Sequence, residues 1–436
     1  MFSCACYRDM YTKEPFYGYD KKERDSVIKA GYKQTELGVI PDDWEVKAVE
    51  EISDVRSGKR LPLGNSLTDK ETPYPYIRVA DMEIGTIVLD DIKYIPPDVY
   101  PCIKNYRIFE EDIFISVAGS LGIVGKIPSQ LNGANLTENA DRLTKISIDR
   151  DYLMYMLMSP LIQNTIESEK TLGAQPKLAL IRIRQFNIPL PPTKTEQTAI
   201  AKALSDTDAL IQSLSQLIVK KRQIKQGAMQ ALLNPYDETG ALKSDWVVKR
   251  LSEIADLATG NTPSTKDKSN YEGKFLFVSP ADLGKRKWIS QTEKTLSTKG
   301  FSLARKFPAN SILFTCIGST IGKSGLAAEE LTSNQQINAV LPNSSFCSEY
   351  LYYFLDLISS AIQASASEQA VPIINKTQFG ETQIYIPNSK NEQKQISKTL
   401  SDMDTEITAL ETKLSKYQKI KQGMMQNLLT GRIRLV

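Results

Sequence analysis

A chain of 436 residues is too long for one ordinary hydrophobic core, so we expect two or more domains. It has no histidine and only five scattered cysteines, which argues against imidazole bases, Ser-His-Asp or Cys-His nucleophiles, a disulfide framework and a structural zinc site. The net charge of +3 is too small to attract nucleic acid by itself, so any binding of DNA would depend on local basic faces.

The first segment, residues 1–35, has neither the apolar run of a signal peptide nor the composition of a transit peptide. No later window reaches the apolar length that a membrane helix needs. We therefore predict a cytoplasmic protein in which residues 1–35 form an N-terminal extension.

From residue 36 onwards the chain is a tandem duplication. Asp43-Trp44 returns as Asp245-Trp246 at an offset of 202, and the stretch IKQGAMQALL, ending at Leu233, returns as IKQGMMQNLL at an offset of 196. The small shortening of the offset is typical of loops that vary in length between copies. We predict two similar globular domains, at residues 36–192 and 234–389.

Both copies predict the same elements in the same order. A short helix follows the tryptophan, and a run of β-branched and aromatic residues then predicts a central strand. A further helix, a strand ending in proline and a long helix complete each copy. The expected ranges are 49–52, 112–117 and 151–168 in the first copy, and 251–254, 311–316 and 348–364 in the second. The last strand of each copy is expected to end in the proline-bearing segments at 189–192 and 387–388.

The long helices fall within residues 193–233 and 390–436. Their apolar residues advance by alternating steps of four and three, which is typical of a coiled-coil seam. Lysines at Lys221, Lys225 and Lys421 interrupt the pattern. The apolar seam residues are Ile200, Leu204, Ile211, Leu214 and Ile218, and then Ile396, Leu400, Met403, Ile407, Leu410 and Leu414.

About forty residues of helix make a rod of roughly 60 Å, and a rod that is apolar along one seam needs a partner helix. The chain order is globule, rod, globule, rod, so we expect the two helices to pair antiparallel about a pseudo-two-fold axis. This predicts an α+β protein with two α/β domains separated by two long antiparallel coiled-coil helices.

Gly227 and Gly423 occupy equivalent places near the ends of the two helices. A glycine inside a helix costs roughly 1 kcal/mol relative to alanine, so keeping it in both copies suggests a close approach. We considered two neighbours: the chain's own globular domain, and a docked partner protein.

Basic residues are the candidate contacts to DNA. Residues 36–192 carry a net charge of −6 and residues 234–389 carry none, so these contacts would have to be local. Asn334, Gln335 and Gln336 add amides that suit base edges. The basic and aromatic candidates are Lys59, Arg60, Arg78, Lys104, Arg107, Lys126, Arg182 and Arg184 in the first copy, and Lys285, Arg286, Lys287, Trp288, Lys306 and Lys323 in the second.

Two short motifs suggest catalysis only weakly. Residues 41–47 (PDDWEVK) contain the letters of a metal-dependent nuclease signature, but the first aspartate stands too close to the E-x-K, and the second copy has Val247 in place of the glutamate. Asn234-Pro-Tyr236 follows a helix end, where Asn-Pro is ordinary turn chemistry, and no glycine-rich cofactor loop precedes it. We predict neither catalytic residues nor a metal site.

Several motifs together resemble the specificity subunits of type I restriction-modification systems. They are GYKQTELGVIPDDW at 31–44, IPLPP at 188–192 followed by EQTAIA at 196–201, and the two helix endings at 225–233 and 421–432. The resemblance covers residues 31–436. It implies two target recognition domains joined by two conserved helices, at 193–233 and 390–436.

In this family each recognition domain would read one half of an asymmetric bipartite site in double-stranded DNA, and the helices would fix the spacing and dock modification subunits. The resemblance implies no catalysis and no bound cofactor for this chain. The modification subunits would use S-adenosylmethionine to methylate adenine, and the restriction subunits would use ATP and magnesium. Two alternatives stay open: a coiled-coil scaffold without DNA readout, and a catalytic methyltransferase or nuclease module.

Overall fold

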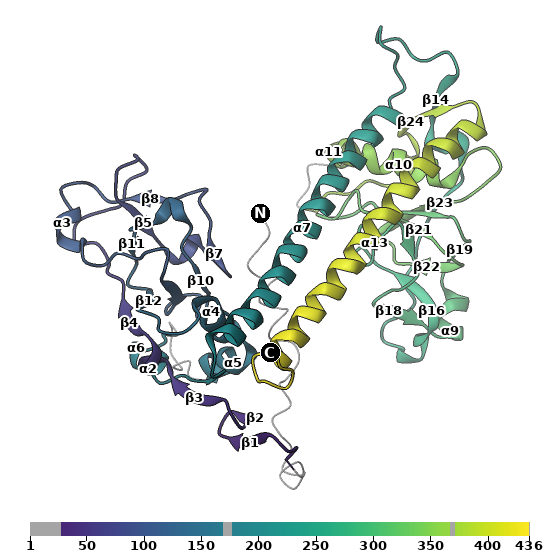
Figure 1. The fold of residues 1–436 in the computed structure, drawn as a ribbon. Coiled ribbons are helices and arrows are strands. Elements are labelled where there is room, and N and C mark those ends of the chain that lie inside the picture. Colours follow the sequence, from purple (N-terminus) through teal and green to yellow (C-terminus); the bar gives the residue numbers. More distant parts are fainter. Residues whose placement is uncertain (1–27, 169–176, 367–370, 436) are drawn as a thin grey trace. The chain divides into compact units, whose positions relative to one another are not determined.

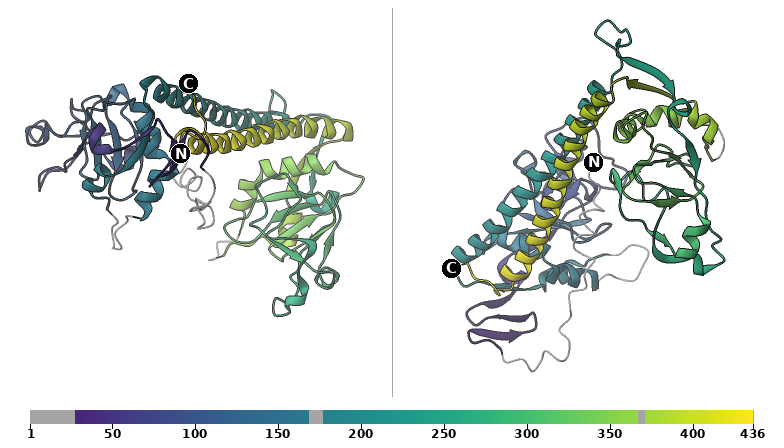
Figure 2. Two further views of the ribbon diagram at one scale, coloured as in Figure 1. Left: turned by 60° about the horizontal axis from the view of Figure 1, so that its bottom comes forward. Right: turned by 90° about the vertical axis from the view of Figure 1, so that its right-hand side faces the viewer.

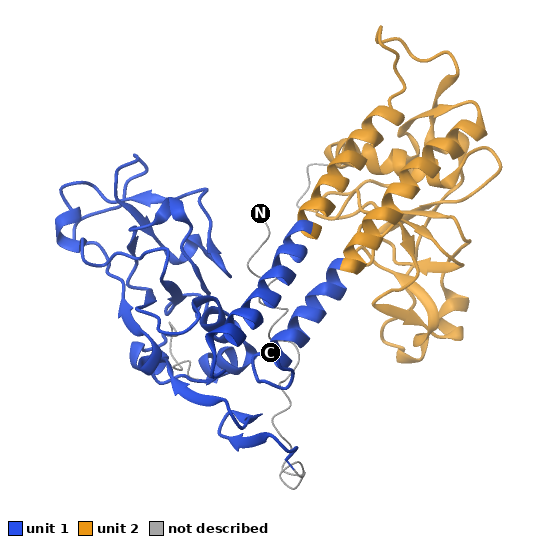
Figure 3. Cartoon of the chain, in the orientation of Figure 1, with its two compact units in different colours: residues 1–213, 414–436 blue, residues 214–413 orange. Residues whose placement is uncertain are grey.

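The computed structural model describes residues 28–168, 177–366 and 371–435, so most of the expected N-terminal extension lies outside the described residues. The chain divides into two compact units (Figure 3). Unit 1 comprises the chain up to Ser213 and from Leu414 onwards, and unit 2 comprises Leu214–Lys413. No helix within the described ranges is long and apolar enough to cross a membrane.

Unit 1 is built on a four-stranded antiparallel sheet in the order β10-β9-β12-β4, beside a three-stranded sheet in the order β11-β5-β8 (Figure 1). The strands are β1 (Tyr32–Thr35), β2 (Gly38–Pro41), β3 (Glu45–Ala48), β4 (Asp54–Ser57), β5 (Pro75–Ile77), β6 (Met82–Glu83), β7 (Thr86–Ile87), β8 (Lys93–Tyr94), β9 (Ile113–Ser116), β10 (Val124–Lys126), β11 (Asn135–Leu136), β12 (Ala140–Thr144) and β13 (Asn187–Leu190). The helices are α2 (Val49–Ile52), α3 (Tyr100–Ile103), α4 (Arg150–Met158), α5 (Pro160–Ser168) and α6 (Leu180–Arg184).

Unit 2 repeats this plan with larger sheets, in the orders β15-β23-β20-β21-β17 and β18-β16-β22-β19. Its strands are β14 (Trp246–Arg250), β15 (Leu257–Thr259), β16 (Tyr271–Val278), β17 (Trp288–Ile289), β18 (Lys294–Leu296), β19 (Lys306–Phe307), β20 (Ile312–Thr315), β21 (Ser324–Ala327), β22 (Leu331–Ser333), β23 (Ile337–Val340) and β24 (Gln383–Pro387). Its helices are α8 (Leu251–Ile254), α9 (Thr298–Leu303), α10 (Ser348–Leu357), α11 (Ser359–Ala364) and α12 (Lys376–Gly380).

The local predictions are confirmed except for the helices expected at 151–168 and 348–364. The second of these is divided at Ile358 into α10 and α11. The short helices α2 and α8 and the central strands β9 and β20 lie where their sequence patterns place them, and every residue of the two strands is buried. The helix expected at 151–168 is wrong as a single element. It is divided into α4 and α5, because Pro160 has no backbone N–H and begins a new helix after Ser159.

Each copy ends in a helix of 39 residues, α7 (Lys194–Leu232) and α13 (Lys390–Leu428). The portions of these helices that belong to one unit lie side by side (Figures 1 and 2). Most of the expected seam is buried, and Met403, Leu410 and Leu414 are partly buried. The fully buried seam residues are Ile200, Leu204, Ile211, Leu214, Ile218, Ile396, Leu400 and Ile407.

The core of each unit needs both long helices. In unit 1, Leu204 from the start of α7 and Leu428 from the end of α13 share a cluster with Trp44. In unit 2, Leu233, directly after the end of α7, and Leu400 from the start of α13 share one with Trp246. Neither half of the sequence therefore completes a core with its own residues alone.

The glycines at Gly227 and Gly423 have open space around them. A Cβ atom built on either glycine has no neighbour within 4 Å among the described residues. The interpretation that they make room for the chain's own globular domains is therefore wrong, and contact with a partner stays a prediction. Gly58 is the opposite case, because a Cβ there collides with the carbonyl oxygens of Leu136 and Thr137.

This contrast gives a stability test. We expect Gly227→Ala to raise the free energy of unfolding by up to about 1 kcal/mol, because alanine is the better helix former and nothing obstructs its methyl group. Gly58→Ala forces backbone atoms apart and should cost about 1–3 kcal/mol. Chemical denaturation of the two variants beside the wild type measures both effects. Destabilisation by Gly227→Ala would contradict the open environment.

Candidate functional site

Three polar side chains tie the two long helices to α4 in unit 1. Tyr155 on α4 donates a hydrogen bond to Asp208 on α7 at 3.0 Å. The Nζ atom of Lys421 on α13 lies 2.6 Å from Asp208 Oδ1 and 5.7 Å from the centre of the Tyr155 ring. The Lys421 side chain is only 5% exposed, so its charge depends on this aspartate and the tyrosine face.

Unit 2 contains the same cluster with the helices exchanged. Tyr353 on α10 donates to Asp404 on α13 at 2.6 Å, and Lys225 on α7 lies 2.6 Å from Asp404 Oδ1 and 5.3 Å from the centre of the Tyr353 ring. Asp404 and Lys421 stand 196 positions after Asp208 and Lys225. In both units an aspartate from one helix meets a lysine from the other, which is an antiparallel register.

The environment keeps both tyrosines protonated as hydrogen-bond donors. Burial, followed by the adjacent aspartate, raises the pKa of Tyr155 and of Tyr353 far above the ordinary value. Both hydroxyls are thus held as donors to the aspartates, which suits a role in positioning the helices. The lysines of the clusters are the residues that interrupt the seam in the sequence.

Arg434, close to the C-terminal end, closes a second contact in unit 1. Its guanidinium binds Asp43 at 2.8 Å and Glu196 at 2.5 Å. It also lies 5.8 Å from the centre of the Trp44 ring. The hydrogen bond from Arg434 is the main reason that the pKa of Asp43 is lowered. In unit 2 a lysine takes the cation position, because Lys243 lies 4.9 Å from the ring centre of Trp246.

The predicted DNA contacts of the first copy fall into two groups. Lys59, Arg60, Lys104 and Arg107 are exposed and come from the segments after β4, after α3 and before β9. The other candidates are engaged inside unit 1 or on its sheet edge. Arg78 binds Asp81 and Asp91, Lys126 binds Asp151, Arg184 donates to the carbonyl of Val55, and Arg182 lies exposed on α6.

In the second copy Lys285, Arg286 and Trp288 are exposed around the turn before β17. Lys306 lies over the Phe301 ring at 4.8 Å, and Lys323 is exposed beside Gly284. Asn334, Gln335 and Gln336 form the turn between β22 and β23. The structure thus places Trp288 and Lys306 on the strands β17 and β19, and the other candidates of this copy on the connecting segments.

Lys287 differs from its exposed neighbours. Its side chain is 7% exposed and binds Glu349 at 2.6 Å and Ser401 at 2.7 Å. Glu349 takes the place on α10 that Asp151 takes on α4, and Asp151 is bound by Lys126. Lys287 therefore supplies, from the segment before β17, the ion pair that Lys126 supplies from β10 in unit 1.

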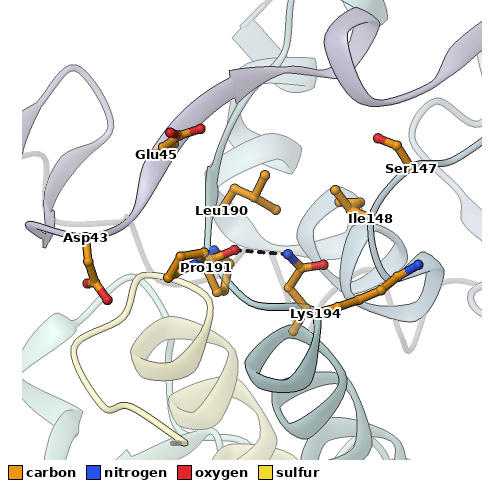
Figure 4. A pocket seen from close by; sticks show the side chains of 9 residues that line it. Asp43, Glu45, Ser147, Ile148, Leu190, Pro191 and Lys194 are labelled. Atoms are coloured by element: carbon orange, nitrogen blue, oxygen red, sulfur yellow. Dashed lines mark hydrogen bonds between the residues drawn. The ribbon is translucent and has the colours of Figure 1, made fainter.

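Figure 4 shows a hollow beside the start of α7. It lies in unit 1, has a volume of about 380 Å³ and is lined mainly by polar and proline residues near the start of α7. Gln197, one of its lining residues, donates to the carbonyl oxygen of Pro191 at 3.0 Å. Within the described ranges no cluster of Cys, Asp and Glu could hold a metal ion.

The pattern of polar seam positions could have revealed the helix clusters. Lys225 and Lys421 were visible as lysines at apolar places, but their partners Tyr155, Asp208, Tyr353 and Asp404 were not predicted. Glu138 and Thr262 were not predicted either, because neither stands out within its own segment. Their importance comes from neighbours that are distant in the sequence.

Comparison with known proteins gives a consistent result. A model of the type I restriction modification DNA specificity domain matches the chain twice, at residues 41–221 and 243–422. The chain is 26% identical to a Methanocaldococcus jannaschii protein provisionally named the specificity subunit of type I restriction enzyme MjaX, over 93% of this chain and 97% of that protein. It is 24% identical to the MjaVIII specificity subunit of the same organism, over 91% and 94% of the two chains.

A solved structure has the same fold. The crystal structure of the type I restriction-modification S subunit from M. genitalium superimposes with a TM-score of 0.58, covering 88% of this chain and 96% of that chain at 18% identity.

The helix clusters predict a sharp difference between two neighbouring aspartates. Asp208→Asn leaves Lys421 buried without a countercharge, so we expect it to lower the free energy of unfolding by about 3 kcal/mol. Asp206 pairs with Lys202 on the exposed face of the same helix, and Asp206→Asn should cost less than about 1 kcal/mol. Denaturation midpoints of both variants check this, and equal effects would contradict the role of the cluster.

Proposed function

Because this chain belongs to the family of type I restriction-modification DNA specificity subunits, with the family's domain present twice, we propose that each of its two domains reads one half of a bipartite site in double-stranded DNA. The duplicated match is the observation that carries the proposal. The recognition domains would be residues 36–192 and 234–389. They share a scaffold but differ in their exposed polar loops, which is what two different half-sites require.

The two long helices would act as a coiled-coil spacer that fixes the distance between the half-sites. Both are 39 residues long, which corresponds to about 60 Å of helix. The buried lysine-aspartate contacts support a fixed register, since a slip by one residue would separate each charge from its partner. The spacer would comprise residues 193–233 and 390–436.

The chain would carry out no reaction itself. We propose that it binds neither S-adenosylmethionine nor ATP, and that modification subunits methylate adenine while restriction subunits supply the ATP- and magnesium-dependent step. Membership in a specificity-subunit family supports this division of labour. The catalytic alternative and the DNA-free scaffold receive no support from the relatives.

Modification subunits would dock on exposed helix faces near Gly227 and Gly423. Ile224 and Ile420, three residues earlier, are exposed apolar side chains at equivalent positions. An apolar side chain beside a glycine in open space suits the close approach of another helix.

Exchange of one domain tests the proposed function. Residues 36–192 are replaced by the corresponding domain of a relative, and the chain is assembled with its modification subunits. We expect the methylated sequence to change in one half-site only, with the other half and the spacing preserved. Sequencing of methylated adenines reads out all three. An unchanged methylated sequence would favour the scaffold, and methylation by the chain alone would favour a catalytic module.

Docking can be separated from folding by filling the open glycines. We expect the double variant Gly227→Leu, Gly423→Leu to keep or raise its denaturation midpoint, because leucine is a better helix former than glycine and a Cβ atom at either position has no neighbour within 4 Å among the described residues. Its affinity for the modification subunits should fall by at least tenfold, measured by titration of the purified proteins. Alanine at both positions is the matched control. Unaltered binding by the leucine variant would rule out this docking surface.

A further inference from the structure

One turn is built in the same way in both units and presents different side chains. It covers Thr137–Asn139 between β11 and β12, and Asn334–Gln336 between β22 and β23. The amide of Thr137 donates to Ile77 and that of Asn334 donates to Val278, the last residues of β5 and β16. The next bonds also correspond, because Ala140 donates to Thr137 and Ile337 donates to Asn334. The two turns are thus structural equivalents.

In each unit a glycine that directly follows a strand, β4 in unit 1 and β15 in unit 2, contacts the turn. The amide of Gly58 donates to Ala140 and that of Gly260 donates to Ile337. A Cβ on Gly58 would collide with the carbonyl oxygen of Thr137, and a Cβ on Gly260 would collide with that of Asn334. Only glycine permits this contact, so the turn and the segment after the glycine are held together as one rigid edge.

The side chains on this edge form an exposed polar pair in each unit. In unit 1, Arg60 binds Glu138 at 2.9 Å, and the arginine side chain is 72% exposed. In unit 2, the hydroxyl of Thr262 donates to Gln335 at 2.5 Å. Thr262 stands two residues after its glycine, as Arg60 does. The position is kept and the chemistry is changed.

Cations flank both pairs. In unit 1, Lys59 lies 5.8 Å from the centre of the Tyr106 ring, and Arg107 is the residue after Tyr106. In unit 2, Arg305 donates to the carbonyl of Thr259 at 2.7 Å, and Lys306 follows it. Strand pairing places Arg107 and Lys306 at equivalent positions. Arg107 is paired with Asn135 and Lys306 with Thr332, and each of these partners stands two residues before its turn. A pair of polar side chains with cations on both sides suits DNA, where the polar pair can contact a base edge and the cations can contact the backbone phosphates.

We propose that these two edges are the base-reading sites of the chain: Arg60 and Glu138 in unit 1, and Thr262 and Gln335 in unit 2. The proposal rests on the proposed function and adds the residues that set each half-site. Arginine recognises guanine and glutamate accepts from cytosine, whereas glutamine pairs with adenine. The edges therefore present different hydrogen-bond patterns to the DNA.

The test uses the whole chain assembled with its modification subunits, on a library of random duplex sequences. Methylated adenines are sequenced for the wild type, for Gln335→Ala and for Arg60→Ala. Each variant should lose roughly 5- to 150-fold of the discrimination between the correct and a wrong base at one position of its own half-site. The other half-site and the spacing should not change.

Matched controls remove the same side chains elsewhere in each unit. Gln383→Ala removes an exposed glutamine at the start of β24, and Arg56→Ala removes an exposed arginine on β4 that binds Asp54. Both should keep the wild-type half-sites. Denaturation midpoints and complex formation of all four variants, measured beside the wild type, show that folding is preserved.

The outcomes distinguish failure of the proposed function from failure of the base-reading assignment. If the wild-type complex methylates no bipartite sequence, the proposed function fails. If it does so and both variants keep their half-sites unchanged, only the base-reading assignment is overturned. A uniform loss of methylation at all sequences would also overturn it, because that is the behaviour of a phosphate contact.

Discussion

The structure depends on a lysine of one long helix being held against an aspartate of the other. This contact occurs once in each unit, between Lys421 and Asp208 and between Lys225 and Asp404. A buried ammonium group without its carboxylate is costly, so only one antiparallel register satisfies both contacts. If the two helices shifted by one heptad, apolar seam residues would still face apolar seam residues. The same shift would separate each lysine from its aspartate and tyrosine partners. Polar seam residues are a known way of specifying register at some cost in stability.

The same constraint explains why the duplicated halves belong to one chain. Each core contains the start of one long helix and the end of the other, so each unit needs both copies of the sequence. In unit 2 the ion pair to α10 comes from the segment before β17, where Lys287 replaces Lys126 of unit 1.

Local structure could be predicted from the sequence, and long-range polar contacts could not. The helices α7 and α13, the short helices α2 and α8 and the buried strands β9 and β20 follow from periodicity and composition within their own segments. The position of Lys287 did not follow, since its run of basic residues is typical of a solvated loop and its partner Glu349 lies 62 residues away. The pairing of Thr262 with Gln335 escaped for the same reason, because two ordinary polar residues gain significance only when the fold joins them. The DNA contacts themselves stay predictions.

The rigid turn edges show how recognition can change without loss of the fold. Gly58 and Gly260 donate backbone hydrogen bonds to Ala140 and Ile337, so these contacts do not depend on the side chains of Arg60, Glu138, Thr262 and Gln335. Arg60 with Glu138 and Thr262 with Gln335 can therefore differ completely on an unchanged backbone. An exposed ion pair contributes little to stability, and its replacement by a neutral hydrogen bond costs the domain almost nothing. A surface of this kind lets selection act on the base that is read, while the lysine-aspartate contacts keep the register of the helices.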